Sequence, residues 1–210
     1  MKRKYPRTMH LPWSPGLSND DKRIDNMDNF INRLIIITEK RDGENITMTK
    51  NYIHSRSLDW KAHESRDWIQ AYWNKIRWEI PENLKIHGES LYAKHSIGYE
   101  HLTSYFECFA VFDEETDCFL SWQETCNMAL HLEMQMVPLI YEGMYEKDYW
   151  TTLRPGDKNE GYVVRLEDEI PLNEFQISVA KYVRANHVNE DEKHWFYNKE
   201  IVKNKLVTGE

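Results

Sequence analysis

The chain has 210 residues, of which 40% are hydrophobic and 13% aromatic, enough for the core of one domain or of one domain with a small appendage. Its formal net charge of −8 excludes a broadly basic coat for nucleic acid, so any polynucleotide contact should be a local groove. Cysteines without Cys-x-x-Cys spacing, no apolar signal core and no bilayer-length segment predict a reducing cytoplasmic location and no membrane contact.

The first part of the chain, residues 5–28, is predicted to be an ordered loop because Pro and Gly punctuate it. The apolar residues 34–37 then predict a buried strand over 33–38, and residues 39–45 follow with the sequence Glu-Lys-Arg-Asp-Gly-Glu-Asn. This Lys-x-Asp-Gly pattern holds Lys40 rigidly at a strand end, and the glycine permits a sharp turn. A lysine amine is a nucleophile once its proton is removed. Asp-Gly is also a common turn dipeptide, so this motif alone equally fits a solvated hairpin.

The remaining elements are mostly strands. Residues rich in β-branched and aromatic side chains predict strands over 33–38, 45–49, 52–55, 84–92, 105–112, 139–141, 161–166 and 176–183. A helix is predicted over 65–78, with Ser65 as its cap, and a second helix follows the capping-box sequence that begins at Ser121 and carries Met128, Leu132 and Met136.

Strands outnumber helices and do not alternate with them regularly, which predicts an α+β fold of mainly antiparallel sheets with flanking helices. The charged segment 189–210 contains the aromatic run 194–197 and is predicted to be a short helical tail docked by its aromatic side chains. We therefore expect one domain over 1–188 and a tail over 189–210.

Five further segments carry residues suited to phosphate and nucleotide chemistry. Arg56 follows the third predicted strand, and its planar fork can bind phosphate oxygens bidentately. Glu89, next to a glycine within a strand, offers a carboxylate as a pure hydrogen-bond acceptor. Phe109 offers a flat ring for stacking. Glu160 precedes a strand and offers hard oxygen ligands for Mg²⁺, and Lys181 lies in the last predicted strand.

Each of these residues has an ordinary alternative reading, as a surface arginine, a strand-edge charge or a core aromatic. In this order, however, the segments resemble the motifs of the covalent nucleotidyltransferases, the superfamily of polynucleotide ligases and mRNA capping enzymes. The chain is similar to the ATP-dependent RNA ligases of the phage T4 RNA ligase 2 type, from Tyr5 to Trp195. The resemblance implies a nucleotidyltransferase (adenylation) domain in which Lys40 takes AMP from ATP, passes it to a 5′-phosphate end and then allows joining to a 3′-hydroxyl.

The resemblance also implies roles for the residues that match. Lys40 is the nucleophile, Lys181 neutralises charge on the α-phosphate, and Glu160 organises Mg²⁺ or Mn²⁺ directly or through water. In the nucleotide site that the resemblance implies, Glu39 reads the adenine edge and the Phe109 ring stacks on the adenine face. Glu89 accepts a hydrogen bond from a ribose hydroxyl, and Arg56 binds phosphates. Asp42 orients the loop or the lysine, and Asn45 belongs to the same motif.

One position departs from the family pattern. The family's last motif carries two lysines one residue apart, and the second falls on Val183 here, so Lys181 or Arg184 alone would carry both tasks. Only residues 182–210 follow Lys181, too few for the complete OB domain of many DNA ligases and capping enzymes.

Three functions therefore remain open at this point. The first is an ATP-dependent RNA ligase acting on a nicked duplex or on free ends, with DNA or a hybrid as alternative substrates. The second, favoured by Val183, is a catalytically reduced module that binds nucleic-acid ends. The third is a DNA ligase or a GTP-dependent capping enzyme.

Overall fold

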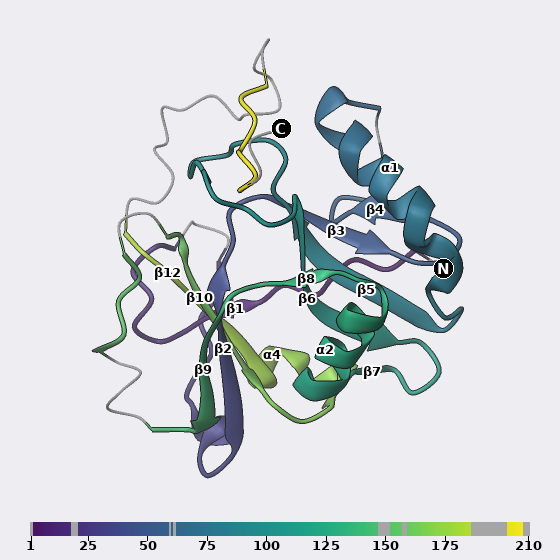
Figure 1. Cartoon of the computed structure of the whole chain (residues 1–210). Helices are drawn as coiled ribbons and strands as arrows, with labels where there is room; N and C mark the ends of the chain where they lie inside the picture. The colour runs from purple at the N-terminus through teal and green to yellow at the C-terminus, as the bar shows by residue number, and fades with distance from the viewer. Residues whose placement is uncertain are drawn as a thin grey trace.

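Two β-sheets packed face to face form the body of the protein (Figure 1). The computed structural model describes residues 2–17, 21–58, 60, 62–146, 152–156, 159–185 and 201–207. Within these residues one sheet has five strands and the other has seven. The main core lies between them, where Ile35 and Ile37 of the first sheet pack with Ala110, Phe112 and Phe119 of the second. The fold is thus the α+β arrangement that the sequence predicts.

The five-stranded sheet carries the lysine motif. Its order is β1-β12-β10-β2-β9, and its bounds are Met9–His10, Val179–Val183, Gly161–Leu166, Leu34–Lys40 and Leu139–Met144. All neighbours are antiparallel except β1 and β12, which are parallel. Ile35, Ile36 and Ile37 are fully buried, because this strand is covered on both faces. That burial fixes the position of Lys40 at the strand end.

The seven-stranded sheet has the order β11-β7-β6-β5-β3-β4, with β8 paired to β6. The bounds are Ile170–Pro171, Cys118–Phe119, Phe106–Asp113, Leu84–Ser90, Glu44–Met48, Ile53–Ser55 and, for β8, Gln135–Met136. Ile46 and Ile86 face one side of this sheet and pack into a second core. Because strand side chains alternate, Asn45, which precedes Ile46, faces the other side together with its register partner Glu89, toward the five-stranded sheet.

Three α-helices and four short 3₁₀ helices accompany the sheets in the described part of the chain. Helix α1 packs on the seven-stranded sheet through Ile69 and Trp73, and α2 packs there through Ala129. The α-helical bounds are Asp67–Ile76, Trp122–His131 and Phe175–Ser178 for α1, α2 and α4. The 3₁₀ bounds are Asp28–Phe30, Glu64–Arg66, Arg77–Glu79 and Leu172–Glu174 for η1 to η4.

Most of the predicted elements are confirmed, and so is the capping box. The Ser121 hydroxyl accepts a hydrogen bond from the Glu124 N–H at 3.2 Å, and the Glu124 carboxylate accepts one from the Ser121 N–H at 3.2 Å. Seven of the eight predicted strands are present with shifts of a few residues at their ends. These are the strands whose apolar runs enter a core.

The predicted helix termini are partly wrong. Ser65 does not cap α1, because it lies inside η2, where the ring of His63 accepts a hydrogen bond from the Ser65 N–H. Leu132 follows the last residue of α2, and Met136 lies in β8, where pairing with β6 replaces the helix.

The last predicted strand, 176–183, is wrong in its first half. Residues Phe175–Ser178 form α4, and the strand begins only at Val179. Its partner β10 ends at Leu166, which the register places opposite Ser178, so residues 175–177 lie beyond the end of that strand. A helical turn satisfies their backbone instead.

The predicted helical tail is also wrong where the structure describes it. Residues 201–207 are extended, with bridges from Lys203 to Ala93 and from Leu206 to Leu102. The Asn204 side chain accepts from the Tyr99 N–H at 2.9 Å and donates to the Leu91 carbonyl at 2.8 Å. The aromatic run 194–197 and the expected boundary at 188 lie outside the described residues.

Strand β12 approaches the start of β10 closely at Gly161, and a substitution there tests this packing. A Cβ at Gly161 would clash with the backbone carbonyl of Tyr182, and a strand backbone cannot move aside cheaply. We expect Gly161→Ala to lower the free energy of unfolding by about 1–3 kcal/mol in urea titrations. Gly156→Ala is the control, because nothing lies within 4 Å of its Cβ, and it should change stability by less than about 0.5 kcal/mol. Equal stability of the two variants would contradict this packing.

Candidate active site

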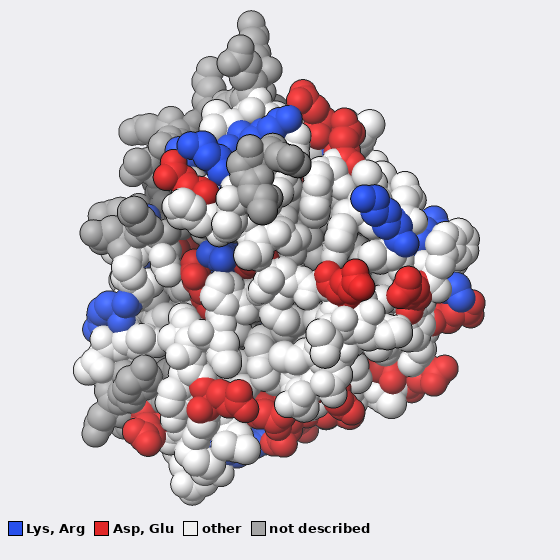
Figure 2. All heavy atoms as spheres, in the orientation of Figure 1, with Lys and Arg blue, Asp and Glu red and all other residues white. Residues whose placement is uncertain are grey.

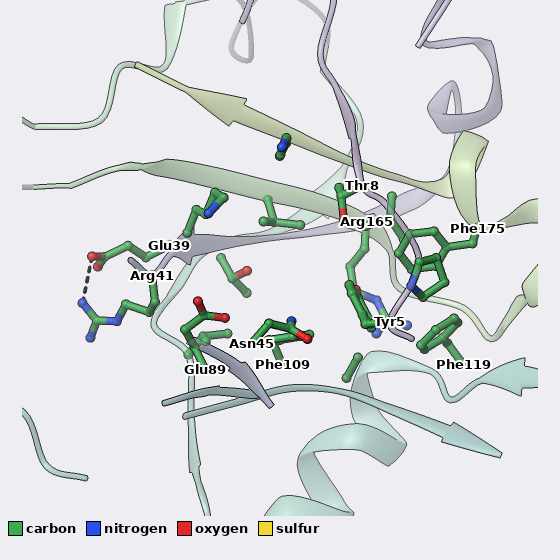
Figure 3. Close-up of a pocket in the computed structure, with 18 of the residues that line it drawn as sticks. Tyr5, Thr8, Glu39, Arg41, Asn45, Glu89, Phe109, Phe119, Arg165 and Phe175 are labelled. Carbon is green, nitrogen blue, oxygen red and sulfur yellow. Dashed lines mark hydrogen bonds and ion pairs between the residues drawn. The ribbon is translucent and has the colours of Figure 1, made fainter. Parts of the chain in front are cut away.

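A cavity of about 290 Å³ opens where the two sheets meet (Figure 3). Seven residues predicted from the sequence line it, from six different elements or loops: Glu39, Lys40, Asn45, Arg56, Glu89, Phe109 and Lys181. Glu160 reaches Lys40 directly, whereas the Asp42 side chain turns to the loop behind the cavity. The fold therefore brings together nearly all the residues that the sequence singles out.

An ion pair between Lys40 and Glu160 lies where β2 ends beside the start of β10. The two side chains meet because Gly161, which follows Glu160, is the register partner of Lys40. Their Nζ and Oε2 atoms are 2.6 Å apart, and the side chains are 25% and 9% exposed. Burial alone would lower the pKa of Lys40, but the carboxylates of Glu160 and Glu89 outweigh burial and raise it. The amine is therefore held protonated in this state.

Lys181 provides a second amine on the same sheet. Val163 of β10 is paired with both Thr38 of β2 and Lys181 of β12, so Lys40 and Lys181 flank one central strand. Burial lowers the pKa of Lys181, the carboxylate of Asp21 opposes this change, and the charge of Lys40 adds to it. The Nζ atom lies 3.5 Å from Asp21 Oδ1.

Glu89 faces the two lysines from the other sheet. Its Oε1 accepts a hydrogen bond from the Gly43 N–H at 3.2 Å, which ties it to the turn after Lys40. Burial raises the pKa of Glu89 to about 8, although the charge of Lys40 opposes the shift. A carboxyl in this state can carry its proton near neutral pH and donate a hydrogen bond.

The turn after Lys40 is held from outside the cavity. Asp42 Oδ2 accepts from the Ile97 N–H at 2.8 Å, and the Asp42 N–H donates to the Tyr99 hydroxyl at 2.9 Å. Asp42 thus orients the loop, one of the two tasks predicted for it. Among the described residues, Asn45 Oδ1 is buried and has no hydrogen-bond partner, so it is ready to accept one from a ligand or to bind a cation.

Phe109 owes its place in the cavity to a β-bulge. His87 pairs with Ala110 and Gly88 pairs with Cys108, which leaves Phe109 as the extra residue of β6. The bulge breaks strand alternation, and as a result both Phe109 and Ala110 line the cavity. The sequence predicts the aromatic residue but not this local geometry.

Arg41, the variable residue of the motif, is engaged at the cavity wall and is not predicted to act there. It donates to both carboxylate oxygens of Glu107, at 2.7 and 3.0 Å, and to Glu39 Oε1 at 2.8 Å (Figure 3). Its guanidinium lies 4.9 Å from the ring centre of Tyr99. The Glu39 carboxylate is therefore oriented by Arg41. Glu39 and Arg41 are two residues apart, but Glu107 lies 66 residues away from Arg41, and no spacing rule connects it with them.

The N-terminal loop supplies another wall that the sequence does not predict. The ring of Tyr5 lies 5.1 Å from that of Phe109, 5.7 Å from Phe119 and 5.3 Å from Phe175. Figure 3 shows it beside Arg165, a buried residue whose pKa is lowered to about 10 by burial. Arg165 donates to the Leu166 carbonyl at 2.9 Å and to the Leu120 carbonyl at 2.7 Å. An aromatic end thus closes the cavity opposite the lysines.

The distribution of charge on the surface agrees with the expectation of a local groove and not of a broadly basic coat. On the face in Figure 2, Lys and Arg side chains form small separate groups, with acidic side chains between them and along one edge. None of the helices in the described ranges combines the length and apolar composition that crossing a bilayer requires.

Comparison with known proteins gives one family. The family model described as RNA ligase matches residues 33–183 of this chain. No curated protein shows a significant match to the sequence.

Several solved structures share the fold at low sequence identity. A mutant RNA ligase of Naegleria gruberi with ATP and Mn gives a TM-score of 0.56 at 18% identity, over 87% of this chain and 60% of that one. An archaeal ATP-dependent RNA ligase gives a TM-score of 0.58 at 15% identity, over 87% of this chain and 48% of that one. A putative ATP-dependent DNA ligase from Aquifex aeolicus gives a TM-score of 0.54 at 16% identity, over 86% of this chain and 50% of that one. This chain therefore spans 48% to 60% of the length of these proteins.

The raised pKa of Glu89 predicts a pH-dependent stability. A carboxyl whose pKa in the folded protein exceeds its ordinary value stabilises the fold below that ordinary value, and the contribution is lost as pH rises through about 8. We expect thermal unfolding of Glu89→Gln to show a smaller loss of stability than the wild type between pH 5 and 9. Glu115→Gln, at an exposed position, is the control and should follow the wild type. A Glu89→Gln profile parallel to the wild type would contradict the shift.

Proposed function

The chain belongs to the RNA ligase family, and on this premise we propose that it is an ATP-dependent RNA ligase that works through a lysyl-AMP intermediate. The observation that carries the proposal is the position of Lys40 Nζ, which lines a cavity between two sheets beside Glu160 and near the second amine of Lys181. The shared fold with an RNA ligase that holds ATP and Mn supports ATP as the nucleotide.

The first step forms a phosphorus–nitrogen bond. Lys40 Nζ, once neutral, attacks the α-phosphorus of ATP, and the bond from that phosphorus to its bridging oxygen breaks, so that pyrophosphate leaves with the electron pair. The amine begins protonated because its pKa is raised, and Glu160 at 2.6 Å is positioned to receive the proton. Lys181 offsets the negative charge that develops on the phosphate oxygens.

The oxygen donors of the site fit a divalent cation shared with phosphate. Within the described residues, no group of three or more His, Cys, Asp or Glu side chains could hold a metal ion by itself. Glu160 and the unpartnered Asn45 Oδ1 are hard oxygen donors, and Mg²⁺ commonly binds through one or two protein oxygens together with substrate phosphates and water. When bound, Mg²⁺ or Mn²⁺ would add positive charge beside the transferred phosphate.

The other sheet supplies recognition of the nucleotide. The Phe109 ring offers its face to the base, and Glu39, oriented by Arg41, offers a carboxylate to the base edge. Glu89, with its raised pKa, can exchange a hydrogen bond with a ribose hydroxyl, and Arg56 can bind phosphate oxygens.

The later steps follow from the same phosphorus chemistry. A 5′-phosphate oxygen attacks the phosphorus of lysyl-AMP and releases Lys40, and then a 3′-hydroxyl oxygen attacks the 5′-phosphate and releases AMP. Arg184 Nε donates to the Asn159 carbonyl at 2.9 Å, which ties Arg184 to the loop before Glu160. We therefore assign the cationic role of the last motif to Lys181 alone.

Two alternatives keep specific support. Val183 favours a catalytically reduced module that binds nucleic-acid ends, since its buried side chain provides no second amine. The likeness to a putative DNA ligase keeps DNA or a hybrid as a possible substrate. The relation to the phage T4 RNA ligase 2 type stays a prediction. Adduct formation with ATP against GTP, and sealing of RNA against DNA nicks, separate these functions.

Lys40→Ala is the direct test of the nucleophile. We expect the wild-type chain, incubated with ATP and Mg²⁺, to gain the mass of one AMP group, and Lys40→Ala to gain none, because the attacking amine is absent. Lys50→Ala is the control, since that lysine lies in a turn and pairs with Glu82. An AMP adduct on Lys40→Ala would refute the assignment, and no adduct on the wild type would favour the binding module.

Phe109→Leu tests the stacking role. Stacking on an aromatic ring contributes about 1–3 kcal/mol per base, so the ATP concentration for half-maximal adduct formation should rise about tenfold or more. The maximal rate should change less, because the ring does not touch the reacting phosphorus. Phe112→Leu, in the core of the same strand, should lower stability without this rise. An unchanged ATP requirement for Phe109→Leu would exclude stacking there.

A further inference from the structure

The N-terminal segment 9–24 lies outside the part of the chain that matches the family, yet it is built onto the strand of Lys181. Strand β1 runs parallel to β12, with His10 opposite Lys181. The Leu11 N–H donates to the Lys181 carbonyl at 2.8 Å, and the Gly16 N–H donates to the Val183 carbonyl at 3.0 Å. These contacts fix the segment beside the second amine of the site.

A chain of polar side chains runs from this segment to that amine. Ser14 Oγ accepts from the Val183 N–H at 2.9 Å and lies 2.9 Å from His10 Nδ1. His10 Nε2 lies 3.2 Å from Asp21 Oδ2, and Asp21 Oδ1 lies 3.5 Å from Lys181 Nζ. Ser14 and His10 are buried, and the Asp21 side chain is 15% exposed. The carboxylate is therefore enclosed between a ring and an amine.

The protonation of His10 follows from its surroundings. Burial, and after it the charge of Lys181, lowers the pKa of His10 to about 4, so the ring is neutral near pH 7. Ser14 has one hydroxyl proton, and the ring nitrogen at 2.9 Å is nearer than the Val183 carbonyl at 3.3 Å. Donation from Ser14 to Nδ1 leaves the proton on Nε2, which faces the carboxylate of Asp21. That contact is not aligned as a full hydrogen bond, so it acts mainly as a dipole against a charge.

A hydrolytic role for this serine, histidine and aspartate is excluded by burial. Ser14 is 0% exposed, and its oxygen already accepts a backbone hydrogen bond, so no substrate carbonyl could reach it. The group instead ends on Lys181, the only member that lines the cavity.

The two positive charges in the cavity explain why a carboxylate beside Lys181 matters. Lys40 and Lys181 bring two like charges to one site, and each lowers the preference of the other for its charged form. Glu160, which directly precedes β10, holds the first amine, and Asp21 of the N-terminal segment holds the second. Without Asp21, repulsion from Lys40 would favour other rotamers of the long Lys181 side chain.

We propose that Asp21, which lies between His10 and Lys181, is a positioning residue that aims the Lys181 amine at the phosphate transferred to Lys40. This inference rests on the proposed function, because it presumes that Lys181 meets that phosphate. It makes the N-terminal segment a working part of the site.

The first experiment measures lysyl-AMP formation by intact mass over time. Asp21→Asn keeps the shape of the side chain and removes its charge, and we expect the rate constant of adduct formation to fall about 10- to 100-fold, since small misplacements cost that much. The ATP concentration for half-maximal rate should change by less than about threefold, because the effect falls on the reacting phosphate. Asp25→Asn, at an exposed position directly after the N-terminal segment, should react like the wild type. Equal rates for Asp21→Asn and Asp25→Asn would overturn the inference.

A second comparison separates positioning from a general loss of structure. If Asp21 acts through Lys181, the loss in the double variant with Lys181→Arg should be smaller than the product of the two single losses. His10→Gln should slow adduct formation in the same direction as Asp21→Asn. Losses that multiply fully would show that the two residues act independently, which would overturn the inference.

A third measurement does not depend on ligase activity. In the ligand-free chain, acetylation of Lys181 by acetic anhydride should be faster in Asp21→Asn than in the wild type, because the amine loses the carboxylate that favours its charged, unreactive form. Peptide mass spectrometry reports that residue alone. If the wild type forms no AMP adduct, the proposed function fails. The acetylation rate still shows whether Asp21 holds the Lys181 amine in its charged form. An unchanged acetylation rate would overturn the inference.

Discussion

The 2.6 Å ion pair between Lys40 and Glu160 is the contact on which the site depends. It exists because β2 and β10 are adjacent and antiparallel, with Gly161 paired to Lys40, so the residue before Gly161 must lie beside the lysine. The same pair raises the pKa of Lys40 and keeps its amine protonated. In the reaction that we propose, Lys40 attacks only after its proton has passed to Glu160, so the ion pair that stores the amine also supplies the acceptor of its proton.

Balanced charge explains how an acidic protein can build the phosphate site that we propose. The cavity gathers the cations of Lys40, Lys181 and Arg56, while Glu89 and Glu160 face them. Burial shifts the pKa of Glu89 upward, so part of this negative charge is neutralised by a proton. The local excess of positive charge therefore coexists with a net charge of −8 for the whole chain. Side chains perform the task that a glycine-rich loop performs in other nucleotide sites.

The sequence predicts the parts of the site that lie on regular strands, and it fails where distant loops meet. Lys40 follows from the apolar run that ends beside it, whereas Lys181 is predicted through the resemblance of its strand to the last motif of the nucleotidyltransferases. Tyr5 and Asp21 come from a loop whose contacts depend on parallel pairing of two residues with β12, a signal too short to read from a pattern. The strand expected over 176–183 begins late because its partner ends at Leu166, a tertiary fact that propensity does not contain.

The two sheets divide the proposed chemistry between them. The five-stranded sheet carries both amines and Glu160, whereas the seven-stranded sheet carries Asn45, Glu89 and Phe109. The distance between reacting groups and recognition groups is therefore set by the core between the sheets, and by Tyr5, whose ring wedges against Phe109 and Phe175 at the closed end. Because packed cores resist compression, that distance is fixed before any nucleotide arrives. A site built this way is preorganised by the same apolar contacts that fold the domain.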